Sequence, residues 1–293
     1  MNLAIGIPAF NEEKNIAAII LKLKKISNTI IVCDDGSKDL TSLISKELGA
    51  IVISHEKNLG YGAAIKSIFF KAKEMNIDIL VTFDADGQHK VDDINKVTEP
   101  IKNNEADIVI GSRFLGKNDN VPKYRKLGIK VITGLTNATV GSKISDAQSG
   151  FRAYSNNVLK NLNPSEQGMG ISTEILIKAS KQNFRIAEVP IEILYGEDTS
   201  THHPVSHGAS VILSTMKFVS IDRPLTFYGI PGVVLFGIGL FFVVWTLQIF
   251  TETNKVITNI ALLGVGGVVL GALLMVAAII LYSLVSVVRE GKH

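Results

Sequence analysis

Short apolar segments alternate with longer amphipathic segments over the first part of the chain. Four of the short apolar segments predict buried strands; they are residues 3–10, 29–37, 50–56 and 77–87. Three amphipathic segments predict helices; they are residues 11–25 (with Asn11 as N-cap), 38–49 and 60–76. This order predicts an α/β fold with a mostly parallel sheet and helices on both faces.

The alternation continues to about residue 195. Two further strands are predicted at residues 107–115 and 185–195, and two further helices at about 128–140 and at 170–183. In open parallel sheets, ligands bind at the carboxyl ends of the strands. Acidic residues end the second and fourth predicted strands, and Arg113 lies near the end of the fifth. We therefore expect the functional site at this edge.

A different pattern begins near residue 225. Residues 227–250 and 257–288 contain no charged side chain, and each segment exceeds the roughly 20 residues that cross a hydrocarbon core. The basic residues Lys217, Arg223, Arg289 and Lys292 flank one side of this pair. The positive-inside rule then predicts a two-helix transmembrane hairpin with both termini in the cytoplasm.

Between these regions, apolar residues recur at helical spacing from Ala209 to Val219. This pattern predicts an amphipathic helix that lies on a membrane surface or packs on the globular domain. We thus expect a cytoplasmic domain at 1–207, a juxtamembrane helix at 208–224 and a transmembrane hairpin at 225–293, in a multi-pass protein of the cell membrane.

Composition excludes several classes of function. The formal charge of +3 is small, and no basic stripe is interleaved with aromatic residues, which argues against nucleic-acid binding. The single cysteine, Cys33, cannot form an internal disulfide, and no Cys/His cluster suggests zinc. The N-terminus lacks the pattern of a secretory signal peptide.

Two carboxylates, Asp84 and Asp86, stand one residue apart at the end of the fourth predicted strand. Such a pair raises the pKa of both groups unless a cation lies beside them. Hard oxygen ligands favour Mg²⁺ or Mn²⁺, and Gln88 offers a neutral oxygen nearby. The alternative is a turn that uses Asp and Gly for backbone reasons alone.

The motifs that follow the first two predicted strands narrow the choice of nucleotide-binding folds. No GxGxxG follows the first strand and no GxxxxGK[ST] occurs, which argues against a dinucleotide fold and a P-loop. Instead the first strand ends in "PAFNEE" and the second in "DDGS". An acid after the second strand is well placed to accept hydrogen bonds from a ribose or a base.

Six ordered motifs then carry a family resemblance: "IPAFNEEKNI", "VCDDGSKDLT", "NLGYGAAI", "FDADGQH", "GSRF" and "DAQSGFRAY". Over residues 1 to about 195 the chain resembles the family 2 glycosyltransferases of GT-A fold, most closely the dolichyl-phosphate mannose and glucose synthases. The resemblance implies transfer of a sugar, with inversion, from GDP-mannose or a UDP-sugar to a polyprenyl phosphate, with Mg²⁺ or Mn²⁺.

The resemblance also implies roles for individual residues. The residues implied to line the nucleotide pocket are Pro8, Asn11, Glu12 and Asp35, with Asp39 supporting that loop. Those implied to bind the metal and diphosphate are Asp84, Asp86 and Gln88. Those implied to lie beside the donor sugar and acceptor phosphate are Asp146, Gln148, Ser149, Gly150 and Arg152. Arg113 would neutralise a phosphate charge; the alternative for Arg113 and Arg152 is a surface salt bridge.

The chemistry agrees with this set of residues. A metal and Arg113 can stabilise the charge on a departing nucleoside diphosphate. A phosphate monoester has a second pKa near 6 and is largely ionised at neutral pH, so it needs positioning rather than a general base. Lys123 and Arg125 are candidates for holding it.

One segment departs from the family. Relatives often carry an arginine after the last strand, whereas this chain reads "YGEDTSTHHPVSHG". Either His202, His203 and His207 take its place, which would make acceptor binding sensitive to pH, or this is a polar loop at the membrane surface.

Two rival functions stay open. A transferase to a hydroxyl of a glycolipid or glycan would need a base, for which Glu174 or Asp146 could serve. A catalytically silent protein could bind nucleotide-sugar and recruit a partner to the membrane. The donor also stays open: mannose is favoured on resemblance alone, with UDP-glucose and UDP-N-acetylglucosamine as alternatives.

Overall fold

The computed structural model describes residues 1–116, 123–140, 143–192, 216, 220–221 and 224–290. The chain divides into two units, Met1–Thr215 and Met216–His293. The strands of the first unit are β1 (Leu3–Ala9), β2 (Thr29–Asp34), β3 (Ile51–Ser54), β4 (Ile79–Thr82), β5 (Ile108–Ser112), β6 (Arg152–Ser155) and β7 (Ile186–Pro190). Its helices are α1 (Ile16–Leu23), α2 (Thr41–Glu47), α3 (Tyr61–Glu74), α4 (Asp93–Lys102), α5 (Lys123–Val140), α6 (Asn156–Asn161) and α7 (Ile171–Lys181).

The described strands form one sheet in the order β3-β2-β1-β4-β6-β5-β7. Every neighbouring pair is parallel except those of β6, which runs antiparallel to both β4 and β5. The prediction of a mostly parallel sheet is confirmed. Because β6 is reversed, it begins at the edge where its neighbours end, with Arg152 opposite Thr82.

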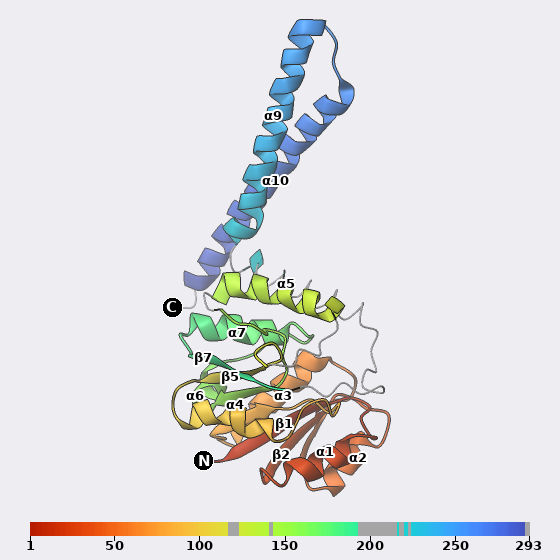
Figure 1. Cartoon of the computed structure of the whole chain (residues 1–293), viewed down its shortest axis with the longest axis vertical. Coiled ribbons are helices and arrows are strands. Elements are labelled where there is room, and N and C mark those ends of the chain that lie inside the picture. The colour runs from red at the N-terminus through yellow and green to blue at the C-terminus, as the bar shows by residue number, and fades with distance from the viewer. Residues whose placement is uncertain (117–122, 141–142, 193–215, 217–219, 222–223, 291–293) are drawn as a thin grey trace. The chain divides into compact units, whose positions relative to one another are not determined.

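Helices cover both faces of the sheet, as predicted (Figure 1). Successive strand side chains point to opposite faces, so Ile30 and Val32 of β2 join one core while Ile31 and Cys33 join the other. Helices α1, α2 and α4 contribute to the first core, and α3, α6 and α7 to the second. Helix α5 lies on the outer side of α7, where the hydroxyl of Ser180 donates to the carbonyl of Val140.

Some predicted elements differ from the structure. The helix predicted at 11–25 begins only at Ile16. Asn11 has a left-handed backbone (φ 56°), and the backbone nitrogens of Asn11 and Glu12 donate to the hydroxyls of Ser37 and Thr41. Asn11 is therefore not the N-cap. Helices α4 and α6 and strand β6 were not predicted. In α4, buried Ile94, Val97 and Ile101 have helical spacing that sequence analysis could have used, whereas β6 is only four residues long.

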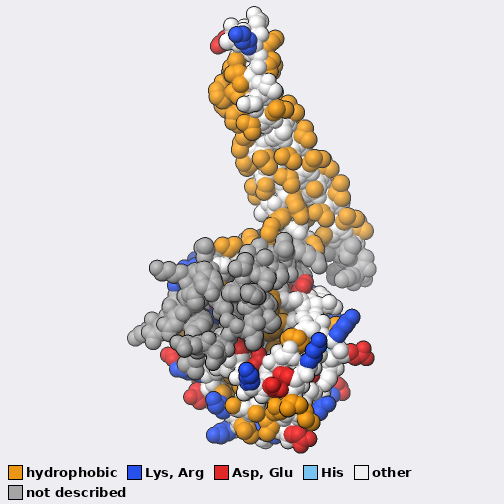
Figure 2. All heavy atoms as spheres, turned by 90° about the vertical axis from the view of Figure 1, so that its right-hand side faces the viewer, with side chains coloured by type: hydrophobic (Ala, Val, Ile, Leu, Met, Phe, Trp, Pro, Cys, Tyr) orange, Lys and Arg blue, Asp and Glu red, His pale blue; other side chains and the backbone are white. Residues whose placement is uncertain are grey.

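The second unit holds two long apolar helices. A short π-helical turn, η1 (Leu225–Gly229), leads into α9 (Ile230–Thr253), and α10 (Thr258–Glu290) follows. Residues Leu225–Thr253 and Thr258–Val287 are long and apolar enough to cross a membrane, and only 6% and 11% of their most apolar stretches are buried, unlike core helices of a soluble protein. Hydrophobic side chains cover the visible face of this pair (Figure 2). The helix predicted at 208–224 lies almost wholly outside the described residues.

Glycines bring α9 and α10 into close contact. A Cβ on Gly239 would lie 2.4 Å from the backbone nitrogen of Val268, and one on Gly267 would lie 2.8 Å from the Cα of Gly239. Small residues permit this approach in membrane helices, where van der Waals packing replaces the hydrophobic effect between helices. By contrast, a Cβ on Gly237 would meet no atom within 4 Å.

We predict that Gly239→Leu separates the two helices and Gly237→Leu does not. Overpacking a tight contact costs about 1–3 kcal/mol. The only tryptophan, Trp245, lies in α9, so its fluorescence in detergent reports unfolding of the hairpin. Gly239→Leu should lower the unfolding midpoint relative to the wild type and to Gly237→Leu. Equal midpoints for the two variants would contradict the close glycine contact.

Candidate active site

The carboxyl ends of the central strands bring the predicted site residues to one edge of the sheet. Asn11, Asp35, Asp84 and Arg113 each follow a strand, β1, β2, β4 and β5 respectively. These strands all run in the same direction within the sheet. Arg152 reaches the same edge because it begins the reversed strand β6. The fold therefore gathers residues that are far apart in the sequence.

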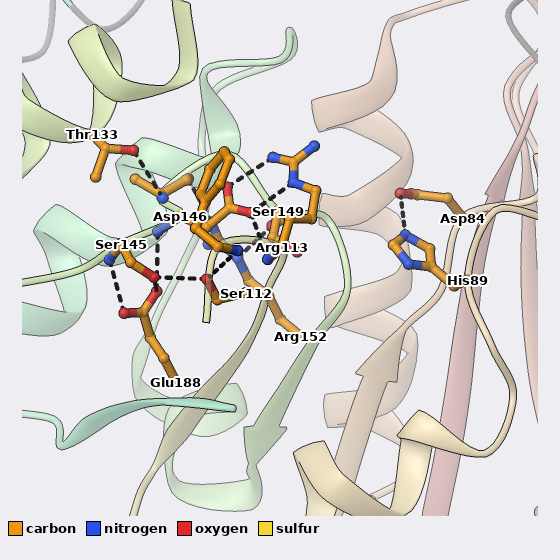
Figure 3. A network of polar contacts seen from close by, with 12 residues as sticks. Asp84, His89, Ser112, Arg113, Thr133, Ser145, Asp146, Ser149, Arg152 and Glu188 are labelled. Carbon is orange, nitrogen blue, oxygen red and sulfur yellow. Dashed lines mark hydrogen bonds and ion pairs between the residues drawn. The ribbon is translucent and has the colours of Figure 1, made fainter. Parts of the chain in front are cut away.

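Asp84 is held by hydrogen bonds to both of its carboxylate oxygens. The hydroxyl of Tyr61 donates to Oδ1 at 3.2 Å. Nε2 of His89 lies 3.3 Å from Oδ2 (Figure 3). The imidazole of His89 is buried and stacks on Phe151, with ring centroids 5.0 Å apart. Burial alone would raise the pKa of Asp84, but the bonds from His89 and Tyr61 and the charge of Arg113 lower it.

Asp86 and Glu12 lie in the negative field of this site. Burial and the charge of Asp84 raise the pKa of Asp86, whose Oδ1 accepts a hydrogen bond from the Gln88 backbone at 3.0 Å. Burial also raises the pKa of Glu12, and repulsion from Asp86, Asp39 and Asp84 acts in the same direction. Carboxylates from two strand ends thus share one region of negative potential, which favours a cation.

The donor set fits Mg²⁺ or Mn²⁺ better than a metal that needs a complete protein cage. Within the described ranges, no group of three or more His, Cys, Asp or Glu side chains is arranged to hold a metal. Asp84, Asp86 and Gln88 offer oxygen ligands only. Mg²⁺ keeps several waters and is commonly bound by one or two carboxylates together with substrate phosphates.

Arg113 forms a two-point ion pair with Asp146. Its Nε donates to Oδ2 at 2.6 Å and its Nη2 donates to Oδ1 at 2.7 Å. The Asp146 side chain is fully buried and that of Arg113 is 18% exposed, so this pair is not a surface salt bridge. The fork fixes the plane of the guanidinium, and its charge reaches Asp84.

The loop that carries Asp146 is itself held by Glu188 of β7. The backbone nitrogens of Ser145 and Asp146 donate to this carboxylate at 2.8 and 3.0 Å. The Ala147 backbone donates to the hydroxyl of Thr133 in α5 at 3.2 Å. Figure 3 shows this network beside Arg113.

Arg152 has a different setting from Arg113. Arg152 is 1% exposed, and its guanidinium donates to the carbonyls of Ala147, Ser149 and Ser172. The surface salt bridge considered for it is therefore excluded. Among the described residues, the buried hydroxyl of Ser149 has no hydrogen-bond partner, and Gln148 donates to Thr173 at 2.9 Å. Arg152 therefore fixes the backbone of this loop, while the Ser149 hydroxyl is left without a partner among the described residues.

Gly150 lies against the carboxylate of Asp84. A Cβ at this position would lie 2.6 Å from the Tyr61 hydroxyl and 2.8 Å from Asp84 Oδ2. The hydroxyl of Thr82 donates to the Gly150 carbonyl at 2.6 Å and fixes the backbone. A side chain here would displace the carboxylate that the metal hypothesis needs.

The loops after β1 and β2 are tied together. The Asn11 side chain accepts a hydrogen bond from the Lys38 backbone, and the Glu12 backbone donates to the Thr41 hydroxyl. Asp39 accepts hydrogen bonds from Thr41 and from the Glu13 backbone. Burial alone would raise the pKa of Asp39, but these bonds lower it.

Asp35 anchors the loop that precedes α3. Its carboxylate accepts hydrogen bonds from the backbone nitrogens of Leu59 and Gly60, and Nδ1 of His55 lies 2.6 Å from its Oδ1. His55 Nε2 lies 3.6 Å from the Cys33 thiol. Burial, followed by the charge of Asp35, raises the pKa of Cys33 to about 12, so this thiol is not a nucleophile at neutral pH. Pro8 is buried in β1, opposite Cys33.

Both candidate general bases are engaged by protein groups. Glu174 is 1% exposed, and its carboxylate accepts hydrogen bonds from Ser165, Glu166 and Lys178. Burial alone would raise the pKa of Glu174, but these contacts lower it. Asp146 is occupied by Arg113. Both carboxylates are thus engaged in contacts within the protein.

For some of the predicted site residues, the structure does not describe the side chain. Lys123 and Arg125 lie in α5, but their side chains are not described, and His202, His203 and His207 lie outside the described residues. Sequence analysis missed four residues that hold the site: His55, Tyr61, His89 and Glu188. His89 and Tyr61 stand within the "FDADGQH" and "NLGYGAAI" motifs, which offered a signal. For Glu188 the sequence offered none.

Known proteins share this sequence and fold. The family model described as glycosyl transferase family 2 matches residues 4–162. A UDP-N-acetylglucosamine–dolichyl-phosphate N-acetylglucosaminyltransferase of Methanococcus voltae is 38% identical over 72% of this chain and 91% of its own. A dolichol-phosphate mannosyltransferase of Pyrococcus furiosus is 35% identical over 65% of this chain and 56% of its own.

Among solved structures, glucosyl-3-phosphoglycerate synthase from Mycobacterium tuberculosis has a TM-score of 0.58 at 20% identity, covering 74% of this chain and 79% of the synthase. This likeness establishes a shared fold. The family match covers more than half of the chain and contains the paired aspartates and Arg113. The chain therefore belongs to glycosyltransferase family 2.

Proposed function

We propose that this enzyme transfers a sugar from a nucleotide-sugar to a polyprenyl phosphate in the membrane. The relatives named for dolichyl phosphate support this acceptor. For the donor, the relative named for UDP-N-acetylglucosamine matches over most of its length and favours that sugar. GDP-mannose, which the sequence motifs favoured by resemblance, is the second candidate because a mannosyltransferase is 35% identical.

The observation that carries the proposal is that both candidate bases are engaged. Glu174 holds the loop at Ser165 and Asp146 holds Arg113. A hydroxyl acceptor would need a base, for which these two were the candidates, whereas a phosphate monoester is already largely ionised at neutral pH. The arrangement therefore suits a phosphate oxygen that attacks the anomeric carbon while the bond to the nucleoside diphosphate breaks on the opposite face.

We assign Asp84, Asp86 and Gln88 to a Mg²⁺ or Mn²⁺ ion. The negative field at Glu12 and Asp86 supports this assignment, and the solved neighbour was crystallised with Mn²⁺ and UDP. When bound, the ion would neutralise charge on the leaving diphosphate. In the chain itself, Tyr61 and His89 orient Asp84 for this task.

The remaining residues have separate roles in the proposal. Asn11, Glu12 and Asp35, on the loops after β1 and β2, would bind the nucleotide, with Asp39 holding those loops together. Ser149 has a buried hydroxyl without a described partner and suits a hydroxyl of the donor sugar. Arg113 is held rigidly near Asp84 and would bind phosphate oxygens.

The apolar helices suit the acceptor. A polyprenyl chain stays in the bilayer, and a transmembrane anchor confines the enzyme to the same surface. We propose that residues 1–207 form the catalytic domain on the cytoplasmic side, that 208–224 form a juxtamembrane segment, and that 225–293 form the anchor. The basic flanks of the hairpin support this orientation.

The function is tested by a donor screen on membranes that contain the expressed protein. Radiolabelled UDP-N-acetylglucosamine, GDP-mannose and UDP-glucose are each supplied with polyprenyl phosphate and Mn²⁺ or Mg²⁺. We expect acid-labile labelled lipid from one donor and its loss when the metal is chelated. Label in a glycan instead would favour a hydroxyl acceptor, and no label from any donor would favour a silent binding protein.

The geometry around Asp84 gives a second prediction. Gly150→Ala places a methyl group in contact with Asp84 and Tyr61, so it should weaken Mn²⁺ binding about 10-fold or more, as changes around metal ligands do. Mn²⁺ affinity is measured by electron paramagnetic resonance of the purified protein. The control is Gly134→Ala in α5, where a Cβ meets nothing within 4 Å. Unchanged Mn²⁺ affinity in Gly150→Ala would contradict the assignment of Asp84 to the metal.

A further inference from the structure

Glu188 lies on the edge strand β7, and its carboxylate is directed to the loop at residues 145–146. Oε2 accepts a hydrogen bond from the Ser145 backbone at 2.8 Å. Oε1 accepts from the Asp146 backbone and from the Ser145 hydroxyl, both at 3.0 Å. Hydrogen bonds to an ionised acceptor are roughly twice as strong as neutral ones. The carboxylate thus fixes the backbone from which Asp146 projects.

The same contacts continue to Arg113. The Asp146 carboxylate accepts the two guanidinium bonds and also a bond from the Arg113 backbone at 3.2 Å. On the neighbouring residue, the hydroxyls of Ser112 and Ser145 lie 2.6 Å apart. Glu188 is therefore linked to both members of the Arg113–Asp146 pair. It binds the backbone of Asp146 directly, and it reaches the residue before Arg113 through Ser145 and Ser112. Figure 3 shows these side chains together, on the β5 and β7 side of Asp84.

The geometry explains why a rigid support is needed here. A guanidinium on a long side chain loses rotamer freedom when it is fixed, and that loss opposes its use for binding phosphate. Asp146 is fully buried, so it can keep its place beside Arg113 only while the backbone that carries it stays in position. A shift of the loop at residues 145–146 would move the fork, and with it the charge that acts near Asp84.

We propose that Glu188 is a positioning residue for the transfer reaction: through the backbone of Ser145 and Asp146, it sets the place and plane of the Arg113 guanidinium. Glu188 itself touches no reacting atom. The proposal rests on the role proposed above for Arg113. In Glu188→Gln, the amide NH₂ group would face one of the backbone N–H groups that donate to the wild-type carboxylate. Two donors cannot bond to each other, so one hydrogen bond is lost and the loop must shift.

A double-mutant cycle tests this proposal in the full-length, membrane-embedded enzyme. The variants are Glu188→Gln, Arg113→Lys and the two together; lysine keeps the charge of Arg113 but loses the fork. We expect Glu188→Gln to lower kcat about 10-fold, since misplacing a positioned group by 1 Å can cost about 100-fold. The double variant should be no slower than Arg113→Lys alone, because residues that act through one another are not additive.

Controls separate this role from a general effect on folding. Glu99→Gln changes an exposed glutamate of α4 and should leave kcat unchanged. Ser145→Ala removes one link to Glu188 and one to Ser112 and gives a second cycle with Arg113→Lys if Glu188→Gln does not fold. This cycle should show the same non-additivity, with a smaller loss of kcat.

Three outcomes would overturn the proposal. If the losses of kcat multiply in the double variants, then Glu188 does not act through Arg113. If Glu188→Gln and Ser145→Ala keep the wild-type kcat while Arg113→Lys is impaired, then Arg113 needs no such support. If Arg113→Lys is fully active, then the role proposed for Arg113 fails, and the proposal for Glu188 fails with it.

Discussion

The repulsion between Asp84 and Asp86 is the constraint on which the rest of the site depends. The chain does not separate the two carboxylates. It fixes Asp84 with hydrogen bonds from Tyr61 and His89, and it leaves no side chain at Gly150, where one would push the carboxylate away. Positive charge nearby favours the ionised form of both carboxylates in such an arrangement. Arg113 supplies one part from the protein, and the proposed metal supplies the other.

The two arginines of the site are held by hydrogen bonds, as Asp84 is. Arg113 and Arg152 both stand in the family motifs but have different surroundings. Arg113 pairs with the buried carboxylate of Asp146, whereas Arg152 donates to three backbone carbonyls. The first keeps a defined orientation at the site, and the second shapes the loop beside it. Asp146 and Glu174 are both engaged in contacts within the protein, which supports the proposed acceptor, a phosphate that brings its own negative charge.

The sequence predicted the sheet, its helical layers and the apolar hairpin, because those features follow from periodicity and length. It missed β6, which is short and begins with a buried arginine, and α4, although the spacing of Ile94, Val97 and Ile101 signalled a helix. The family motifs named the residues at the sheet edge. They could not show what holds those residues, because Glu188 reaches Ser145 across 43 positions of the chain and no local pattern records such a contact.

The central claim is that the paired aspartates exist to hold a divalent metal together with a nucleoside diphosphate. The most direct test is a Mn²⁺ titration of the purified protein, followed by electron paramagnetic resonance, with and without the nucleoside diphosphate of the donor found in the screen. The account predicts one Mn²⁺ site whose affinity rises when the diphosphate is present, and its loss in Asp86→Asn. An Mn²⁺ affinity that does not change when the diphosphate is added, or that is the same in Asp86→Asn, would contradict it.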